Sequence, residues 1–344
     1  MDASDVLNLA RAQFGLNIGF HILFPSLTIA LGWILLYFRV RYARSGDPSW
    51  LATYRLWTKV FALSFAMGVV SGITMSFQFG TNWPGYMLKV GNIAGPLLAS
   101  GLTASFVIAG LSAWRLLRAG EDASARRTLR TGLVLAAALA PLQIFVGDMH
   151  GLNTLEHQPA KIAAVEAIWN TGKGVPLVLF AVPNEEKRRN DFAIEIPKGA
   201  SLVLRHDADA ELKGIDAFAP DVAPVAPVFF AFRLMVGMGV LMLLAAWTGV
   251  WVTRRGVLPP RWMLWGLSGF TFAGWIATLA GWIVTEIGRQ PWLVTGILKT
   301  ADAAGGASGA QLGASLTGYV LTYTAMLVAY FVVLTHLAGK GAQP

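Results

Sequence analysis

The chain has 344 residues, of which 55% are hydrophobic and only 13% are charged, whereas a soluble domain carries roughly 25% charged residues. This composition excludes an ordinary water-soluble domain, and the absence of cysteine excludes disulfides, thiolate metal sites and thioether-linked haem. The net charge of +8 requires no nucleic-acid partner, because the basic residues gather in loops between apolar stretches. We therefore expect a protein whose main surroundings are membrane lipid.

Seven stretches of the sequence are apolar over about 20 residues, the length that a helix needs to cross a membrane. We expect an all-α fold, a polytopic transmembrane helical bundle with about seven spans. The N-terminus lacks the basic segment and cleavage site of a signal peptide, so the first helix is expected to be retained. In chain order, the predicted spans are 15–38, 59–79, 95–117, 130–148, 227–252, 263–286 and 316–337.

Basic residues alternate between the predicted loops, and this alternation predicts the orientation, because cytoplasmic loops are enriched in lysine and arginine. The loops after the first, third and fifth spans hold most of the arginines. By contrast, the loop after the second span has only Lys89, and the loop after the sixth has Arg289 and Lys299. We therefore predict a multi-pass protein with its N-terminus outside and its C-terminus in the cytoplasm.

A polar stretch, residues 149–225, interrupts the apolar pattern on the predicted outer side. It is too long for a passive connection and contains the charged, partly strand-like segment NEEKRRNDFAIEIPKG. We interpret it as a binding loop, the alternative being a structural cap. The predicted organisation is an N-terminal four-helix transmembrane part, 1–148, the outer loop, 149–225, and a C-terminal three-helix transmembrane part, 226–344.

Polar side chains inside the predicted spans are costly in lipid, so each one is a candidate functional residue. His21, in the first span, is either a satisfied core residue or a metal ligand through its imidazole. Met235 would ordinarily fill a core, although a thioether can also bind haem iron. Arg233 lies two residues before Met235, and a guanidinium in a membrane helix needs a fixed anion, for which haem propionates are suitable.

Glu286 and Arg289 close the sixth predicted span, in the sequence GWIVTEIGRQPW. Their spacing of three residues allows an ion pair on the outer turn of the helix, an arrangement that says little about function. The alternative is that each of them needs a partner of opposite charge elsewhere.

Six blocks of the sequence resemble, in the same order, subunit I of the cytochrome bd quinol oxidases, most closely the cyanide-insensitive branch. The resemblance covers nearly the whole chain and implies a subunit of a quinol:oxygen oxidoreductase in the aerobic respiratory chain of a bacterial inner membrane. It implies a high-spin haem b, a haem d or second haem b, a low-spin haem b, ubiquinol as substrate, and a second subunit, subunit II. The blocks are FGLNIGFHILFPSLTIALG, GVVSGITMSFQFGTNWPGY, GDMHGLNTLEHQPAKIAAVEAIW, FAIEIP, PVFFAFRLMVGMG and GWIVTEIGRQPW.

The resemblance also implies roles for single residues. The implied iron ligands are His21, for a haem of the oxygen-reducing pair, Glu286, for the high-spin haem b, and Met235, for the low-spin haem. Lys161 and Glu166 match a pair tied to quinol oxidation. Glu286, Arg233 and Trp282 are the predicted catalytic residues, and Arg289 and Arg11 complete the predicted cofactor-binding set, with Arg289 offering its charge to a propionate.

The sequence departs from the family between the second and third predicted spans. The family continues there through two more helices, the third and fourth of nine, whereas GPLL here runs directly into ASGLTASFVIAGLSAWRLL. The histidine that would pair with Met235 is absent, and Pro96 or Leu97 stands near its place. We predict that His21 and Glu286 still hold a haem, while the low-spin site is weakened or empty unless His150 supplies a substitute ligand.

Three functions remain open from the sequence. The first is a bd-type oxidase subunit, impaired by the missing helices. The second is a non-enzymatic membrane protein that binds haem or quinol. The third is a transporter or channel that uses Glu286 and Arg289 as pathway charges.

Overall fold

The computed structural model describes residues 3–82, 98–120, 122–303 and 305–340. The chain divides into two compact units, which we describe separately. Unit 1 comprises Met1–Gln143, Gly239–Thr278 and Gly305–Pro344, and unit 2 comprises Ile144–Met238 and Leu279–Ala304. Helices α5, α8 and α10 each run from one unit into the other.

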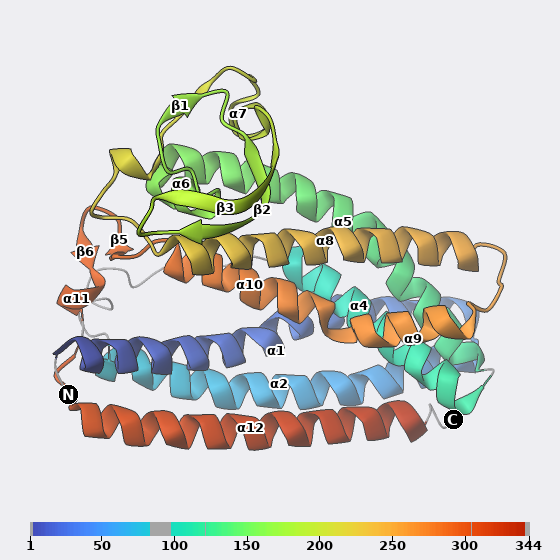
Figure 1. Ribbon diagram of the computed structural model, residues 1–344. Coiled ribbons are helices and arrows are strands. Elements are labelled where there is room, and N and C mark those ends of the chain that lie inside the picture. Colours follow the sequence, from blue (N-terminus) through green and yellow to red (C-terminus); the bar gives the residue numbers. More distant parts are fainter. Residues whose placement is uncertain (1–2, 83–97, 121, 304, 341–344) are drawn as a thin grey trace. The chain divides into compact units, whose positions relative to one another are not determined.

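Most of the described chain is helical (Figure 1). The helices are α1 (Ala3–Ser45), α2 (Pro48–Asn82), α4 (Leu98–Ala119), α5 (Ala123–His157), α6 (Pro159–Val165), α7 (Gly199–Arg205), α8 (Val225–Thr253), α9 (Arg261–Gly269), α10 (Ala273–Ile287), α11 (Thr300–Ala303) and α12 (Gly309–Lys340), with 3₁₀ turns η1 (Ile215–Ala217) and η2 (Phe270–Phe272). The strands are β1 (Gly172–Lys173), β2 (Leu177–Asn184), β3 (Arg189–Ile196), β4 (Glu211–Leu212), β5 (Trp292–Val294) and β6 (Leu298–Lys299).

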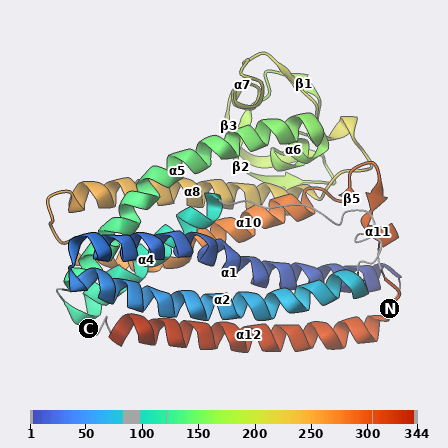
Figure 2. The ribbon, with the colours of Figure 1, turned by 180° about the vertical axis from the view of Figure 1, so that it is seen from behind.

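Unit 1 is a bundle in which α1, α2 and α12 lie side by side, as Figures 1 and 2 both show. Helix α4 packs against α1, α9, η2 and α12, and its residues 102–113 are all buried. Small residues allow these helices to approach closely, as is common between membrane helices. A Cβ atom on Gly132 of α5, for example, would lie 2.7 Å from the carbonyl oxygen of Ser105 in α4.

A proline inside α5 shows how a membrane helix tolerates a missing backbone donor. Pro141 has no N–H, so the carbonyl of Ala137, four residues earlier, loses its usual helical partner. The indole Nε1 of Trp247 in α8 donates to that carbonyl at 3.1 Å. The side chain thus satisfies a backbone group that would otherwise face lipid unpaired.

Six helical segments among the described residues are long and apolar enough to cross a membrane. They correspond to six of the seven predicted spans, and α9, η2 and α10 together form one of them, over Arg261–Ile287. The remaining predicted span, 95–117, corresponds to α4, apart from residues 95–97, which lie outside the described ranges. Helix α4 is not among the six. The chain is a multi-pass helical membrane protein, as predicted.

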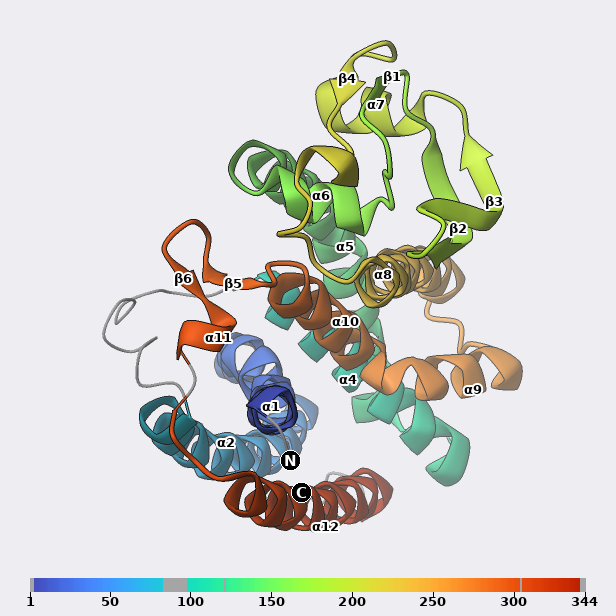
Figure 3. The same cartoon turned by 60° about the vertical axis from the view of Figure 1, so that its left-hand side comes forward.

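Unit 2 gives the predicted polar loop a fold of its own. Helix α5 continues past the predicted end of its span, residue 148, to His157, and α6 follows after Gln158. Strands β2 and β3 then form an antiparallel hairpin with two register shifts (Figure 3), and α7 packs against β2. An apolar core holds the segment together; it includes Ala163, Trp169, Val178, Val228 and Phe229. The predicted domain boundaries at 148 and 225 stay predictions.

Candidate functional site

Lys161, Glu286 and Arg289 form one charged group in unit 2. Glu286 and Arg289 form an ion pair at the C-terminal end of α10, as their spacing allows. Lys161, in α6, donates from Nζ to the carbonyl of Thr285 at 3.3 Å. Burial lowers the pKa of the Lys161 ammonium from its ordinary 10.5; the Arg289 charge lowers the pKa further and Glu286 opposes the shift. The predicted quinol-site lysine thus lies beside the predicted haem-site carboxylate.

Glu166 and Arg233 form a second, more deeply buried pair. Arg233 donates from Nη2 to a Glu166 carboxylate oxygen at 2.7 Å, and only 6% of Glu166 is exposed. The same guanidinium donates to the carbonyls of Val178, at 2.7 Å, and Val165, and it lies 3.8 Å from the ring centroid of Phe229. Burial raises the pKa of the Glu166 carboxyl, and the Arg233 charge opposes that shift. The fixed anion that Arg233 requires is therefore supplied by the protein itself.

Met235 follows Arg233 by two residues on α8 and packs against a glycine. A Cβ atom on Gly281 of α10 would come within 2.9 Å of the Met235 Sδ, so the absence of a side chain there makes room for the thioether. Next to Gly281, the indole Nε1 of Trp282 is buried and has no hydrogen-bond partner among the described residues. The Nε of Arg289 is in the same situation. Two buried N–H donors without acceptors match the carboxylate chemistry of haem propionates.

His21 lies in unit 1, on a polar face of α1. Its Nδ1 lies 3.1 Å from the hydroxyl oxygen of Ser71 in α2. A Cβ atom on Gly72 would lie 3.0 Å from the ring carbon Cε1, so a glycine is needed where the imidazole rests on α2. A histidine held by one nitrogen can present the other to a metal, which is how protein metal sites fix the tautomer.

The polar face of α1 continues towards its N-terminus at intervals of four residues, through Asn17 and Gln13. Gln13 donates to the hydroxyl of Ser315 at 2.8 Å. Asn17, fully buried, accepts hydrogen bonds from Tyr323 of α12 and, at 3.2 Å, from Thr74 of α2. Its Nδ2 has no partner among the described residues. The spacing of these residues was visible in the sequence, but their partners on α2 and α12 were not.

The predicted site residues therefore fall into groups. Unit 2 contains Lys161, Glu166, Arg233, Met235, Trp282, Glu286 and Arg289, whereas unit 1 contains His21 and Arg11. Arg11 is half-buried on α1, and His150, the possible substitute ligand, is exposed on α5. The place of the missing histidine, near Pro96 or Leu97, lies outside the described residues. Sequence reasoning missed the pairing of Glu166 with Arg233, which are 67 positions apart and carried no local signal.

Comparison with known proteins gives a consistent result. The family model described as "Cytochrome bd terminal oxidase subunit I" matches residues 9–101 and 97–342. "Cytochrome bd-II ubiquinol oxidase subunit 1" of Escherichia coli is 27% identical over 504 aligned positions, covering 98% of this chain and 97% of that protein. "Cytochrome bd ubiquinol oxidase subunit 1" of Bacillus subtilis is 26% identical, with 86% of each chain covered.

A solved structure shares the fold. "The structure of bd oxidase from Geobacillus thermodenitrificans" superposes with a TM-score of 0.88 at 21% sequence identity, covering 98% of this chain and 99% of that one. The alignment with the Escherichia coli protein extends over 504 positions although this chain has 344 residues, so it contains long gaps. The two segments of the family match meet at residues 97–101.

Proposed function

Because the chain belongs to the family of cytochrome bd terminal oxidase subunit I, we propose that it oxidises a quinol and passes the electrons to oxygen. In this reaction the quinol loses electrons and protons to become a quinone, and oxygen gains them to become water. The relatives named as ubiquinol oxidases support ubiquinol as the substrate. The observation that carries the proposal is the arrangement of Lys161, Glu166, Arg233, Glu286 and Arg289 as two charged groups in unit 2.

Lys161 and Glu166 are the residues that we propose for quinol oxidation. Glu166 is a buried carboxyl whose raised pKa suits it to accept a proton from a quinol hydroxyl. Arg233 holds that carboxyl in place through a short hydrogen bond and is itself fixed by two backbone carbonyls. Lys161, with its lowered pKa, can donate a hydrogen bond to a quinol oxygen at a small desolvation cost.

The donor set fits haem, which would supply one-electron transfer and the binding of oxygen. His21, Glu286 and Met235 are the proposed iron ligands, and they offer the imidazole, carboxylate and thioether chemistry that haem proteins use. The unpaired N–H groups of Trp282 and Arg289 would donate to propionates. Glu286 would have to exchange its ion pair with Arg289 for the metal, which frees the guanidinium for a propionate.

We further propose that the family's third and fourth helices are missing from this chain. The long gaps in the alignment with the longer relative and the junction of the family match near residue 100 support this. The low-spin haem would then lack the histidine that pairs with Met235, so we expect its site to be weakened or empty. A second subunit, a high-spin haem b and a haem d or second haem b follow from the family in the same way.

Purified protein in detergent provides the test. We expect haem bands in a reduced-minus-oxidised spectrum and oxygen uptake that depends on added ubiquinol. Lys161→Ala and Glu166→Ala should lower that uptake at least tenfold, roughly the loss of one charge-assisted hydrogen bond. Haem without uptake would make the chain a non-enzymatic haem-binding protein, and the absence of haem would favour a transporter.

A further inference from the structure

A pocket of about 760 Å³ lies within unit 1, between the C-terminal part of α1 and the beginning of α5. On α1, Ile34, Tyr37 and Arg41 follow one another at intervals of three and four residues and so share one face of the helix. On α5, Arg130 and Val134 are spaced in the same way. Helical periodicity thus builds two facing walls, each apolar at one end and basic at the other.

The basic end of the pocket carries more positive than negative charge. Arg41, Arg127 and Arg130 line it, and among the described residues Asp47 is the one acidic residue that does. Asp47 pairs with Arg127 and accepts hydrogen bonds from the hydroxyl and backbone N–H of Ser49. The hydrogen bonds from Ser49, followed by the contact with Arg127, lower the pKa of the Asp47 carboxyl to about 2. The carboxylate is therefore charged, and Arg127 already neutralises that charge.

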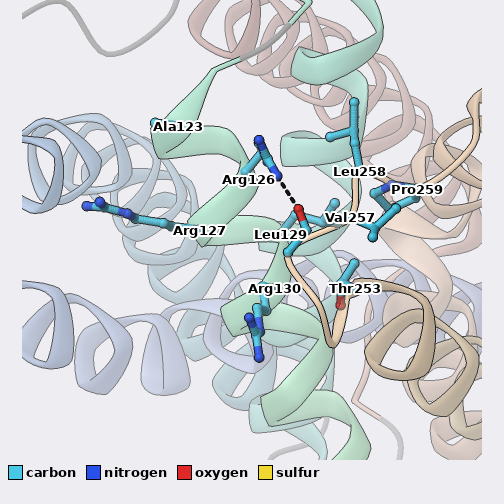
Figure 4. A pocket seen from close by; sticks show the side chains of 10 residues that line it. Ala123, Arg126, Arg127, Leu129, Arg130, Thr253, Val257, Leu258 and Pro259 are labelled. Carbon is cyan, nitrogen blue, oxygen red and sulfur yellow. Dashed lines mark hydrogen bonds between the residues drawn. The ribbon is translucent and has the colours of Figure 1, made fainter.

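Arg41 and Arg130 have no carboxylate partner within the described part of the chain. The guanidinium of Arg41 lies 5.3 Å from the ring centroid of Trp50, and Arg130 forms no ion pair with these residues. Figure 4 shows that Arg126, Arg127 and Arg130 leave α5 in different directions, with Arg126 hydrogen-bonded to the carbonyl of Gly256 in a smaller pocket of about 250 Å³. Arg130 is therefore available to a ligand of the larger pocket.

The apolar end begins about one to two helical turns from these charges. Val134 lies four residues beyond Arg130, roughly 6 Å along the helix at 1.5 Å per residue. Ile34 is buried in the opposite wall, and Trp33 and Tyr37 are exposed beside it. Aromatic rings of this kind concentrate at the depth where lipid headgroups meet the hydrocarbon.

We propose that this pocket binds an anionic phospholipid, with its phosphate on Arg41 and Arg130 and an acyl chain along Ile34 and Val134. Guanidinium groups bind phosphate through paired, charge-assisted hydrogen bonds, and basic pockets between membrane helices bind acidic headgroups. A free phosphate would leave the apolar walls unfilled. A zwitterionic lipid also carries a phosphate, but its cationic headgroup would offset that charge beside the two guanidinium groups, and an uncharged lipid would supply no counter-charge at all.

The test uses the full-length protein, freed of lipid in detergent and titrated with phosphatidylglycerol or phosphatidylcholine in mixed micelles. Binding is followed by thermal unfolding and by native mass spectrometry of the retained lipid. We expect Arg41→Gln with Arg130→Gln to weaken phosphatidylglycerol binding about tenfold or more, because a charge-assisted contact is lost at each position. The control, Arg39→Gln with Arg44→Gln, removes the same charge from exposed positions on α1 outside the pocket and should leave binding unchanged.

A second variant separates a lipid from a free anion. Val134→Trp fills the apolar end while keeping all three arginines, so it should weaken phosphatidylglycerol binding as well. The proposal is overturned if phosphatidylcholine binds as tightly as phosphatidylglycerol, or if the control pair weakens binding equally. It is also overturned if inorganic phosphate reproduces the stabilisation and Val134→Trp has no effect, since the site would then be a phosphate site.

Discussion

The ion pair of Glu166 with Arg233 places two charges where little water reaches them. Removing one partner of such a pair leaves the other charge buried and uncompensated, which costs far more than the pair itself contributes. Because Arg233 also holds the backbone carbonyls of Val165 and Val178, it ties α6 and β2 to α8. The pair therefore supports the local fold of unit 2 as well as the charge of the candidate quinol site.

Replacing Glu166 with Gln should make the stability of the protein less dependent on pH, because the amide mimics the protonated carboxyl and cannot ionise. Burial raises the pKa of Glu166 above its ordinary 4.5, so the folded protein holds this proton more tightly than the unfolded chain. The contribution of this carboxyl to the free energy of unfolding is fully present below pH 4.5 and is lost as the pH rises through the raised pKa.

Thermal unfolding in detergent from about pH 4 to about pH 8 measures this dependence, since the range spans the ionisation of a carboxyl with a raised pKa. Glu186→Gln, at an exposed position in the turn between β2 and β3, is the matched control and should behave like the unmodified protein. An unfolding temperature of Glu166→Gln that matches this control at every pH would contradict the buried pair.

Met235 gives a second prediction at this scale, which rests on the proposed haem function. A thioether is a weak ligand that usually relies on a strong ligand opposite. If the low-spin site lacks its histidine, Met235→Leu should leave the haem content and the low-spin electron paramagnetic resonance signal unchanged. His21→Ala, by contrast, should lower the haem content in a pyridine haemochrome assay. A full low-spin signal that Met235→Leu abolishes would show that another residue has replaced the histidine.

Among the elements, α4 is crossed closely by its neighbours at small residues. Its neighbours approach through small residues: Gly110 lies against Thr271, Gly132 against Ser105, and Gly274 against Thr103. At each of these crossings a Cβ atom on the glycine would meet a backbone atom at 2.7–2.8 Å, alongside threonine side-chain atoms at two of them, and backbone cannot rotate away as a side chain can. These contacts allow α4 to be enclosed by its neighbours in unit 1.

Adding one methyl group at such a crossing tests this arrangement. Gly132→Ala should destabilise the protein by about 1–3 kcal/mol, the usual cost of overpacking, because the new Cβ would lie 2.7 Å from the Ser105 carbonyl oxygen. Gly147→Ala, in the same helix with nothing within 4 Å, should leave the stability unchanged or raise it slightly. Unfolding temperatures measured side by side in one detergent decide this, and equal values for both variants would contradict the close crossing.

The elements also show what sequence patterns can and cannot specify. Apolar runs located the membrane helices because hydropathy is a local property that lipid selects directly. They did not predict that α5 would continue to His157, since a helix beyond the membrane is stabilised by contacts that the pattern does not contain. The irregular β2–β3 hairpin likewise depends on packing within unit 2.

The same distinction holds for the candidate site. The spacing of Glu286 and Arg289 already allowed their ion pair, because both lie on one helical turn. The partner of Arg233 could not be predicted, because Glu166 comes from a distant segment that only the folded chain brings close. The haem roles of His21, Met235 and Glu286 were assigned from the resemblance and stay predictions.

For the whole molecule, the number of membrane crossings determines on which side the C-terminus lies. Seven crossings starting from an outer N-terminus end in the cytoplasm, whereas six end outside. The six apolar helices of the described chain do not include α4, so the crossing of α4 decides between these outcomes. The arginines of the loops favour seven, because they recur after alternate predicted spans.

A reporter that is active only in the cytoplasm should therefore be active when it is fused after Pro344. The same reporter, inserted between Glu186 and Lys187 in the exposed turn of unit 2, should be inactive because this turn is predicted to lie outside. The pair of fusions controls for expression, since both carry the same reporter on the same chain. Activity of both reporters on the same side would show that the predicted topology is wrong.

The polar face of α1 also has a consequence for the order of events during synthesis. Gln13 and Asn17 find partners on α12, in Ser315 and Tyr323, about 300 positions later in the chain. At roughly 5–20 residues per second, α12 leaves the ribosome about 15–60 s after α1. During that interval the amide of Asn17 must be shielded by α2, by the insertion machinery or by water. The bundle of unit 1 can thus close only after α12 has entered the membrane, and a chain that stops before α12 would leave these amides without their partners.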